Sequence, residues 1–477
     1  MKNKILTVLL SVALAITITF ATFSVYATGS INIGDTNGDG KIDLADVNHL
    51  AQYVAGWDVK LGEGATSSQP EQIGTKFDNA NEANIWDDLP NKDDVNILMW
   101  RDYTPTEEKL IKDYEALTGV DIVTTVTTEL EYPTKLVSMI FDNNAPDIVK
   151  FSANIFPSLI IKAMQPLDAE TFYLDSDCWN KKYMDAYKIN GKYYGVSMPG
   201  SWLCEDTNYV TYYSPSVLRS CGVTTMPYTL YQQGQWNWDT QNQIIRKAHA
   251  SGLTGISMQS YDSFMHSAGV DFVAYNGSEY TNKLGSLTDS DLLSSSWIEV
   301  ANLKVDNCLT GWALNDFKQN KVGLFTGIAY GLYNEGDWFS SSFAKELEAV
   351  PVAGPKGKAA YTPASPACWG VPKKASNAEG AAYFLRYFLD TSNYNHSSTF
   401  HTAQFESVFN IITSATDKKS FMYGRGVTDH VTVNTYDYIC NSLISTNPKD
   451  ITTKLNSKKN TVDTGVSRAN KDFKNLQ

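Results

Sequence analysis

The chain has 477 residues, more than one hydrophobic core usually supports, so two lobes or domains are expected. Its formal net charge is −13, with 39 basic and 52 acidic residues, so nucleic acid is not an expected partner. Aromatic residues make up 12% of the chain, and its 11 Trp and 27 Tyr could supply flat apolar surfaces for sugars or peptides.

Residues 1–27 have the pattern of a signal peptide. Lys2 and Lys4 precede an apolar run over residues 5–23, and the stretch ends in the small residue Ala27. An uncleaved membrane anchor is the alternative, because a run of this length could almost span a bilayer. We therefore expect an exported protein, either extracellular or associated with the cell surface. The first cysteine is Cys178, so a typical lipoprotein is not expected.

Residues 35–46 read DTNGDGKIDLAD, the pattern of a calcium-binding loop. Such a loop offers oxygen ligands from its positions 1, 3, 5, 7, 9 and 12, with a glycine at position 6 for the sharp turn. Gly40 occupies that sixth position. Ca²⁺ is therefore the predicted cofactor, and its predicted ligands are Asp35, Asn37, Asp39, the carbonyl of Lys41, Asp43 and Asp46.

A short helix is predicted directly after this loop, because apolar residues recur at helical spacing up to Gly56. Residues 32–57 resemble one repeat of a type I dockerin, an EF-hand-like helical module, with Asp46 where other calcium loops have Glu. Dockerins normally pair two repeats to bind a cohesin, and no second loop follows here. A cohesin-like or cell-surface partner and a calcium-stabilised N-terminal cap both stay open. Residues 58–92 are polar and are predicted as a linker.

Alternating strand and helix signals begin near residue 93. Residues 95–100, VNILMW, are typical of a buried strand, and Thr104 with Glu107 forms a capping box at the start of a helix that Gly119 can end. Residues 120–127 follow as the next strand. Strand, helix and strand without a hairpin signal predict a βα unit of a parallel sheet, and the alternation continues past residue 400.

Several phrases of the body are similar to one known family in their order and spacing. They are NAPDIV (144–149), QPLD (165–168), NGKYYGVSM (190–198), WNWDTQNQIIRKA (236–248), KVGLFTGIAYGLY (321–333), VPVAGPKG (350–357) and WGVPKKASNAEGAAYFLRYFL (369–389). Together they resemble the extracellular solute-binding proteins, family 1, of ABC sugar importers, over about residues 93–477. The resemblance implies an α/β, two-lobed, periplasmic-binding-protein-like fold (type II) with a cleft between the lobes. It places lobe one at about 93–204 and 350–392, and lobe two at about 205–349 and 393–477.

A sugar needs aromatic faces for its C–H patches and carboxylates or amides for its hydroxyls. Trp100, Arg101 and Asp102 follow the first predicted strand, where ligands of open α/β sheets bind. The resemblance adds further cleft positions, namely Phe156, Trp202, Glu205, Gln259, Tyr261, Tyr330 and Trp369.

Four other positions bear on the aromatic lining of the cleft. The family usually has Trp where this chain has Ala329, so stacking either moves to Tyr330 or is lost. Trp238 precedes Asp239, a natural N-cap, so it is expected to pack at the start of a helix rather than on a ligand. Trp312 and Trp338 stay undecided between core and surface.

The sequence thus predicts an exported substrate-binding protein that captures a carbohydrate, an oligosaccharide above all, for an ABC importer permease. A peptide or other small solute stays open as the ligand. A secreted glycoside hydrolase that carries the dockerin-like repeat is the first alternative, and a calcium-dependent docking or scaffold protein is the second. Hydrolysis needs two facing carboxylates, which spacing does not reveal for Asp147, Glu205 and Asp206, and no catalytic motif is found, so an enzyme is not expected.

The six cysteines are widely spaced, which favours free thiols.

Overall fold

The computed structural model describes residues 75–80, 85–87, 89–152, 162–336, 338–414, 418–429 and 434–475. All of them belong to one compact unit, Ile73–Gln477. The predicted signal peptide, the predicted calcium loop with its following helix, and Phe156 lie outside the described residues.

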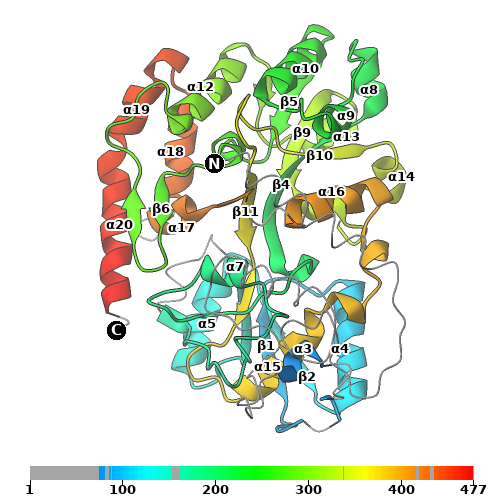
Figure 1. Ribbon diagram of the computed structural model, residues 1–477, viewed down its shortest axis with the longest axis vertical. Coiled ribbons are helices and arrows are strands. Elements are labelled where there is room, and N and C mark those ends of the chain that lie inside the picture. The colour runs from blue at the N-terminus through cyan, green and yellow to red at the C-terminus, as the bar shows by residue number, and fades with distance from the viewer. Residues whose placement is uncertain are drawn as a thin grey trace, which may run out of the picture. The chain divides into compact units, whose positions relative to one another are not determined.

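The first lobe is built on a four-stranded sheet with the order β12-β3-β1-β2 (Figure 1). Its strands are β1 (Val95–Met99), β2 (Ile122–Val126), β3 (Ile148–Phe151) and β12 (Cys368–Gly370). β1 pairs in parallel with both β2 and β3, whereas β12 is antiparallel to β3. The predicted parallel βα unit is therefore present. Helices of this lobe are α3 (Thr75–Asp78), α4 (Pro105–Thr118), α5 (Tyr132–Phe141), α7 (Lys181–Asp185) and α15 (Ala378–Phe388).

Helix α4 begins and ends as its sequence predicts. Thr104 is the N-cap, and its side chain accepts from the backbone N–H of Glu107 while the Glu107 carboxylate accepts from the backbone N–H of Thr104. Gly119 ends the helix in the left-handed conformation, with φ of 74°. The apolar face buries Leu110 and Tyr114 in the core of the lobe.

The second lobe is built on a seven-stranded sheet with the order β13-β11-β4-β9-β5-β8, and β10 also pairs with β4. Its strands are β4 (Glu205–Tyr213), β5 (Thr254–Met258), β8 (Leu309–Thr310), β9 (Val322–Ile328), β10 (Glu348–Pro351), β11 (Thr362–Pro366) and β13 (Lys419–Phe421). A separate hairpin joins β6 (Val273–Tyr275) and β7 (Tyr280–Asn282). β4 is antiparallel to β9, β10 and β11, so this sheet is mixed.

Helices surround this second sheet (Figure 1). They are α8 (Pro215–Ser220), α9 (Pro227–Gln232), α10 (Trp238–Ala250), α11 (Ser263–Ser267), α12 (Leu292–Val305), α13 (Leu314–Lys318), α14 (Ser341–Ala344), α16 (Ala403–Ser414), α17 (Tyr423–Asp429), α18 (Thr435–Ile444), α19 (Ile451–Ser457) and α20 (Lys459–Lys474). The N-cap of α10 is Asn237 and not Asp239, because the Asn237 side chain accepts from the backbone N–H groups of Asp239 and Thr240. Trp238 is buried, as expected of a residue that packs at the helix start.

The chain crosses between the two sheets three times, and two of the crossings lie side by side. One leads into β4 at Glu205, the next joins β11 to β12 at Ala367, and the third joins α15 to α16. β11 is antiparallel to the start of β4, with Ala364 opposite Asn208 and a register shift at Ser365/Pro366. Figure 1 shows these two strands side by side.

The predicted boundary of lobe one at residue 350 is wrong. Residues 350–366 contribute β10 and β11 to the second sheet, because both strands pair with β4. The chain re-enters the first sheet only at Cys368, where β12 begins. This boundary depends on pairing between strands that lie more than a hundred residues apart in the chain. The local sequence therefore does not reveal it.

The predicted linker also ends earlier than residue 92. Within it, Phe77, Ile85 and Trp86 are buried in the core of the first lobe. The Phe77 ring lies 4.3 Å from the ring of Tyr173, and Arg386 Nε donates to the Phe77 carbonyl at 2.8 Å. The few apolar residues of this polar stretch pack one by one into the core of the lobe. They therefore show no helical or strand periodicity in the sequence.

All six cysteines lie within the described residues and are free thiols, as the sequence favoured. Five are buried, and Cys178 is partly exposed. Among the described residues, none of the helices combines the length and the apolar character that crossing a membrane requires.

Candidate ligand-binding cavity

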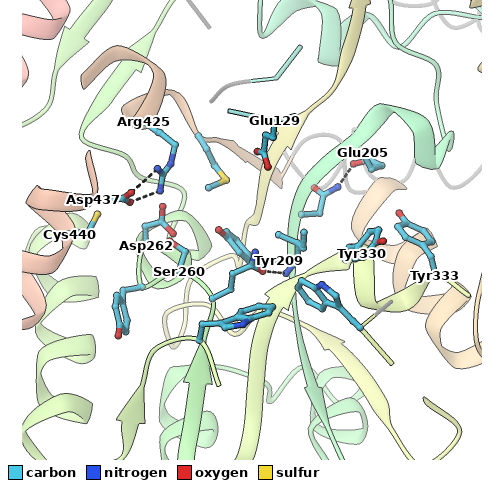
Figure 2. A pocket seen from close by; sticks show the side chains of 18 of the residues that line it. Glu129, Glu205, Tyr209, Ser260, Asp262, Tyr330, Tyr333, Arg425, Asp437 and Cys440 are labelled. Carbon is cyan, nitrogen blue, oxygen red and sulfur yellow. Dashed lines mark hydrogen bonds and ion pairs between the residues drawn. The ribbon is translucent and has the colours of Figure 1, made fainter. Parts of the chain in front are cut away.

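A cavity of about 780 Å³ is lined by residues from both lobes and from the crossing strand β4. This volume is in the range of about 300 to 1,000 Å³ typical of small-molecule sites. The lining residues are Trp100, Arg101, Glu129, Lys150, Trp202, Glu205, Asn208, Tyr209, Gln259, Ser260, Tyr261, Asp262, Trp312, Ile328, Ala329, Tyr330, Tyr333, Trp338, Met422, Arg425, Asp437, Cys440 and Asn441. Figure 2 shows eighteen of them.

Seven of the ten predicted ligand-binding residues line this one cavity. They are Trp100, Arg101, Trp202, Glu205, Gln259, Tyr261 and Tyr330. They come from separate segments of the chain, and the strand ends bring them together. Their contact with a ligand stays a prediction.

Two of the predicted residues do not line the cavity. Asp102 is exposed and lies outside the lining. Trp369 is fully buried: its Nε1 donates to the Leu203 carbonyl at 3.2 Å, and its ring packs edge-on against Phe388. Trp369 is therefore a core residue, because β12 is covered on both faces. The position of Trp369 at the start of a predicted strand could not distinguish a core residue from a cleft residue.

The aromatic surface of the second lobe comes from residues that the sequence left undecided. Trp312 and Trp338 both line the cavity, with ring centroids 5.0 Å apart, and Trp338 meets Tyr330 at 5.8 Å. Trp312 is 51% exposed, so its face is accessible. Ala329, at the position where a Trp was expected, is buried. Aromatic rings thus reach the cavity from other positions of the chain.

On the first-lobe wall, Arg101 is held by a buried carboxylate. Its two terminal nitrogens donate to the Glu107 oxygens at 2.7 and 2.8 Å, and Glu107 is fully buried at the start of α4. The same capping box that begins α4 therefore orients Arg101. Bidentate pairing compensates its charge and fixes the orientation of the guanidinium.

Glu205 stands where the chain first crosses between the lobes. Its carboxylate accepts from Tyr183 Oη at 2.8 and 3.0 Å and from the side-chain amide of Asn208. Lys419 on β13 is 8% exposed, and its Nζ lies 3.4 Å from Asn208 Oδ1. Burial raises the pKa of Glu205, while Lys419, Tyr183 and Asn208 act to lower it. Burial lowers the pKa of Lys419, and Glu205 opposes that change.

A polar cluster forms the opposite wall, in the second lobe (Figure 2). Asp262 is 1% exposed, and its Oδ2 accepts from Tyr436 Oη at 2.7 Å. Arg425 donates to both oxygens of Asp437 at 2.7 and 3.2 Å and lies over the Tyr436 ring at 4.9 Å. No sequence signal indicated these residues, because α17 and α18 come more than 150 residues after Asp262 and no motif marks them.

Asp147, one of the carboxylates considered for hydrolysis, does not line the cavity. Asp147 is fully buried and accepts from the backbone N–H groups of Asn96, Ser376 and Asn377, which gives it a structural role. The side chain of Asp206 lies outside the described residues. Within the described part of the chain, no three His, Cys, Asp or Glu side chains are grouped as metal ligands.

A family model described as bacterial extracellular solute-binding protein matches residues 109–419. No curated protein matches the chain.

Solved structures resemble the chain over about four fifths of its length. The galacto-N-biose-/lacto-N-biose I-binding protein of the ABC transporter from Bifidobacterium longum is 13% identical with a TM-score of 0.58, over 79% of this chain and 97% of that one. The ABC transporter associated binding protein from B. animalis subsp. lactis Bl-04, in complex with β-1,6-galactobiose, is 17% identical with a TM-score of 0.56, over 80% and 99%. The cyclic alpha-maltosyl-1,6-maltose binding protein from Arthrobacter globiformis is 14% identical with a TM-score of 0.55, over 80% and 99%. This likeness confirms the predicted two-lobed α/β fold.

Proposed function

Because the chain belongs to the bacterial extracellular solute-binding proteins, we propose that it captures an oligosaccharide between its lobes and delivers it to an ABC importer permease. Membership of this family implies an exported protein. The observation that carries the proposal is the cavity lining, which combines the exposed face of Trp312 with carboxylates and amides. Two proteins with the same fold are named for sugars that they bind and a third is in complex with β-1,6-galactobiose, which supports a carbohydrate as the ligand class.

The lining residues have complementary roles in this proposal. Trp100, Trp312 and Trp338 offer ring faces for the C–H patches of a sugar, while Glu205 and Asn208 offer groups for its hydroxyls. Gln259 Oε1 accepts from the backbone N–H of Ile328 at 2.9 Å, which orients its amide and leaves Nε2 as the donor for a ligand. The crossing strands β4 and β11 act as the hinge about which the lobes close, and no bond of the ligand is broken.

We also propose that the N-terminal loop binds Ca²⁺ through Asp35, Asn37, Asp39, the Lys41 carbonyl, Asp43 and Asp46. This module would position or retain the protein at the cell surface without a lipid anchor. The proposal rests on the ligand spacing of the sequence, since these residues lie outside the described part of the chain.

A thermal-shift screen tests the binding proposal. The mature protein, with calcium kept saturating, is heated with neutral oligosaccharides, monosaccharides or short peptides. A ligand at 100 times its Kd stabilises the folded state by about 2.7 kcal/mol, which raises the midpoint by a few degrees. We expect that rise with one class of oligosaccharide, recovered unhydrolysed. A rise with peptides alone would contradict carbohydrate capture, and hydrolysed glycan in the samples would favour an enzyme.

A further inference from the structure

Some of the charged side chains that line the cavity are paired with an opposite charge, and others are not. Both arginines of the lining already hold carboxylates of the protein, Arg101 with Glu107 and Arg425 with Asp437, each through two hydrogen bonds. The charge of each guanidinium is therefore already balanced by a carboxylate of the protein. The remaining cation among the described lining residues is Lys150, which is 7% exposed.

Lys150 is packed between rings rather than directed at open space. Its Nζ lies 5.4 Å from the Trp100 ring and 5.6 Å from the Trp369 ring. The lining also contains three carboxylates that form no ion pair with an arginine, namely Glu129, Glu205 and Asp262. Glu205 has Lys419 beside it, whereas Glu129 is exposed at the wall. Glu129 and Asp262 are thus lining carboxylates without a hydrogen-bonded cation among the described residues, and Asp262 is attracted by Arg425 only through space.

Asp262 is the buried member of that pair, and only one of its oxygens is used. Oδ2 accepts from Tyr436 Oη, while Oδ1 has no hydrogen-bond partner among the described residues. His266 Nε2 lies 3.8 Å from Oδ2, which is beyond hydrogen-bond distance. A buried carboxylate oxygen without a partner is unfavourable, so such an atom on a cavity wall indicates a missing donor.

We propose that Asp262 makes this cavity selective for glycans that carry no acidic group, by accepting a hydrogen bond from a sugar hydroxyl or amino group at Oδ1. The inference rests on the proposed function and specifies its ligand class. A hydroxyl or amino group supplies the donor that Oδ1 lacks. A uronate or sulfate group at the same place supplies no donor and sets a second negative charge beside a buried carboxylate, which is repulsive at short range.

The first test compares matched ligands of the unaltered protein. Isothermal titration calorimetry with calcium saturating measures Kd for neutral trisaccharides of glucose and galactose and for uronic-acid trisaccharides of the same linkages. We expect at least one neutral trisaccharide to bind at least tenfold more tightly than its uronate counterpart. Equal or tighter binding of the uronate form overturns the inference but keeps the proposed function. Absence of binding by every glycan contradicts the proposed function, and the inference with it.

The second test removes the charge of Asp262 and retains its shape. In Asp262→Asn, the affinity for the neutral trisaccharide should fall about tenfold, and the ratio of uronate Kd to neutral Kd should fall by at least tenfold. Glu129→Gln is the matched control, because it removes the same charge from an exposed position of the same cavity. Its ratio should change less than threefold, and 0.5 M salt should abolish that change, since exposed charges are screened and buried ones are not.

The two variants distinguish local selection from a general charge effect. Equal changes of the ratio in Asp262→Asn and Glu129→Gln would overturn the role of Asp262. If Asp262→Asn does not fold, the comparison in the unaltered protein at low and high salt decides the question: discrimination that persists in 0.5 M salt supports a buried determinant, and discrimination that disappears contradicts it.

Discussion

At the scale of single residues, Glu205 at the crossing between the lobes is the lining carboxylate whose pKa the structure shifts. Glu205 is ionisable, lines the cavity and has neighbours from both lobes: Tyr183 on α7 belongs to the first, and Lys419 on β13 belongs to the second. Burial favours its protonated form, and the ammonium group of Lys419 opposes that preference. We therefore expect the balance between burial and these opposing groups, Lys419 first among them, to set the pH range in which Glu205 can accept hydrogen bonds as a carboxylate.

Lys419→Met should shift the pH dependence of ligand binding toward higher pH. The Lys419 charge lowers the pKa of Glu205, so its removal raises that pKa further. As the pH falls, a ligand that needs the ionised carboxylate should therefore lose affinity at a higher pH in the variant than in the unaltered protein. Titration calorimetry between pH 4 and 8 measures this shift. Lys345→Met, an exposed lysine of the same lobe, is the control. Superimposable curves for all three proteins would contradict the role of Lys419.

At the scale of elements, the short helix α3 fastens the start of the described chain to the first lobe. Lys76 Nζ donates to Tyr383 Oη at 2.7 Å, and Arg386 on α15 donates to the Phe77 carbonyl. The Phe77 ring contacts Tyr173, Trp179 and Tyr383. One four-residue helix is not stable alone, so these tertiary contacts hold it.

Phe77→Ala should destabilise the protein by about 3 to 5 kcal/mol, because it leaves a cavity in a closed aromatic cluster. Phe141→Ala is the matched control: Phe141 is 82% exposed on α5, and its removal should change the free energy of unfolding by about 0.5 kcal/mol or less. Urea unfolding followed by tryptophan fluorescence measures both. A change below about 1 kcal/mol for Phe77→Ala would show that the start of the chain is not part of the lobe.

On the scale of the whole molecule, the proposed function couples a closing cavity to a separate calcium module. β4 and β11 pair where two of the three crossings lie, so we expect closure to need only small changes in a paired region. In this proposal the calcium module acts on the location of the protein rather than on the ligand. Calcium should therefore not be needed for the cavity to form.

Equilibrium dialysis against ⁴⁵Ca²⁺ should find one ion bound per mature chain. Asp39→Ala or Asp46→Ala should weaken that binding at least tenfold, since each removes a charged ligand of the loop. Cell fractionation with and without a chelator tests retention: the unaltered protein should leave the cell surface when calcium is removed. A protein that is fully soluble in the culture in both conditions would contradict the retention role, whatever its calcium affinity.

The sequence by itself determined the features that depend on nearby residues. The capping box at Thr104, the left-handed end at Gly119 and the parallel βα unit all follow from interactions within a few residues or from apolar periodicity. Seven of the residues that line the cavity were also predicted, two from their place after the first strand and five from the resemblance to extracellular solute-binding proteins.

Only the tertiary structure decided the features that depend on distant partners. It assigned β10 and β11 to the second sheet through their pairing with β4, placed Trp369 in the core, and brought Trp312 and Trp338 to the cavity. It also joined Asp262 to Tyr436 across more than 170 residues. A side chain is buried or exposed according to what packs on it, and a carboxylate is paired or unpaired according to what lies beside it. Neither property is fixed until the chain has folded.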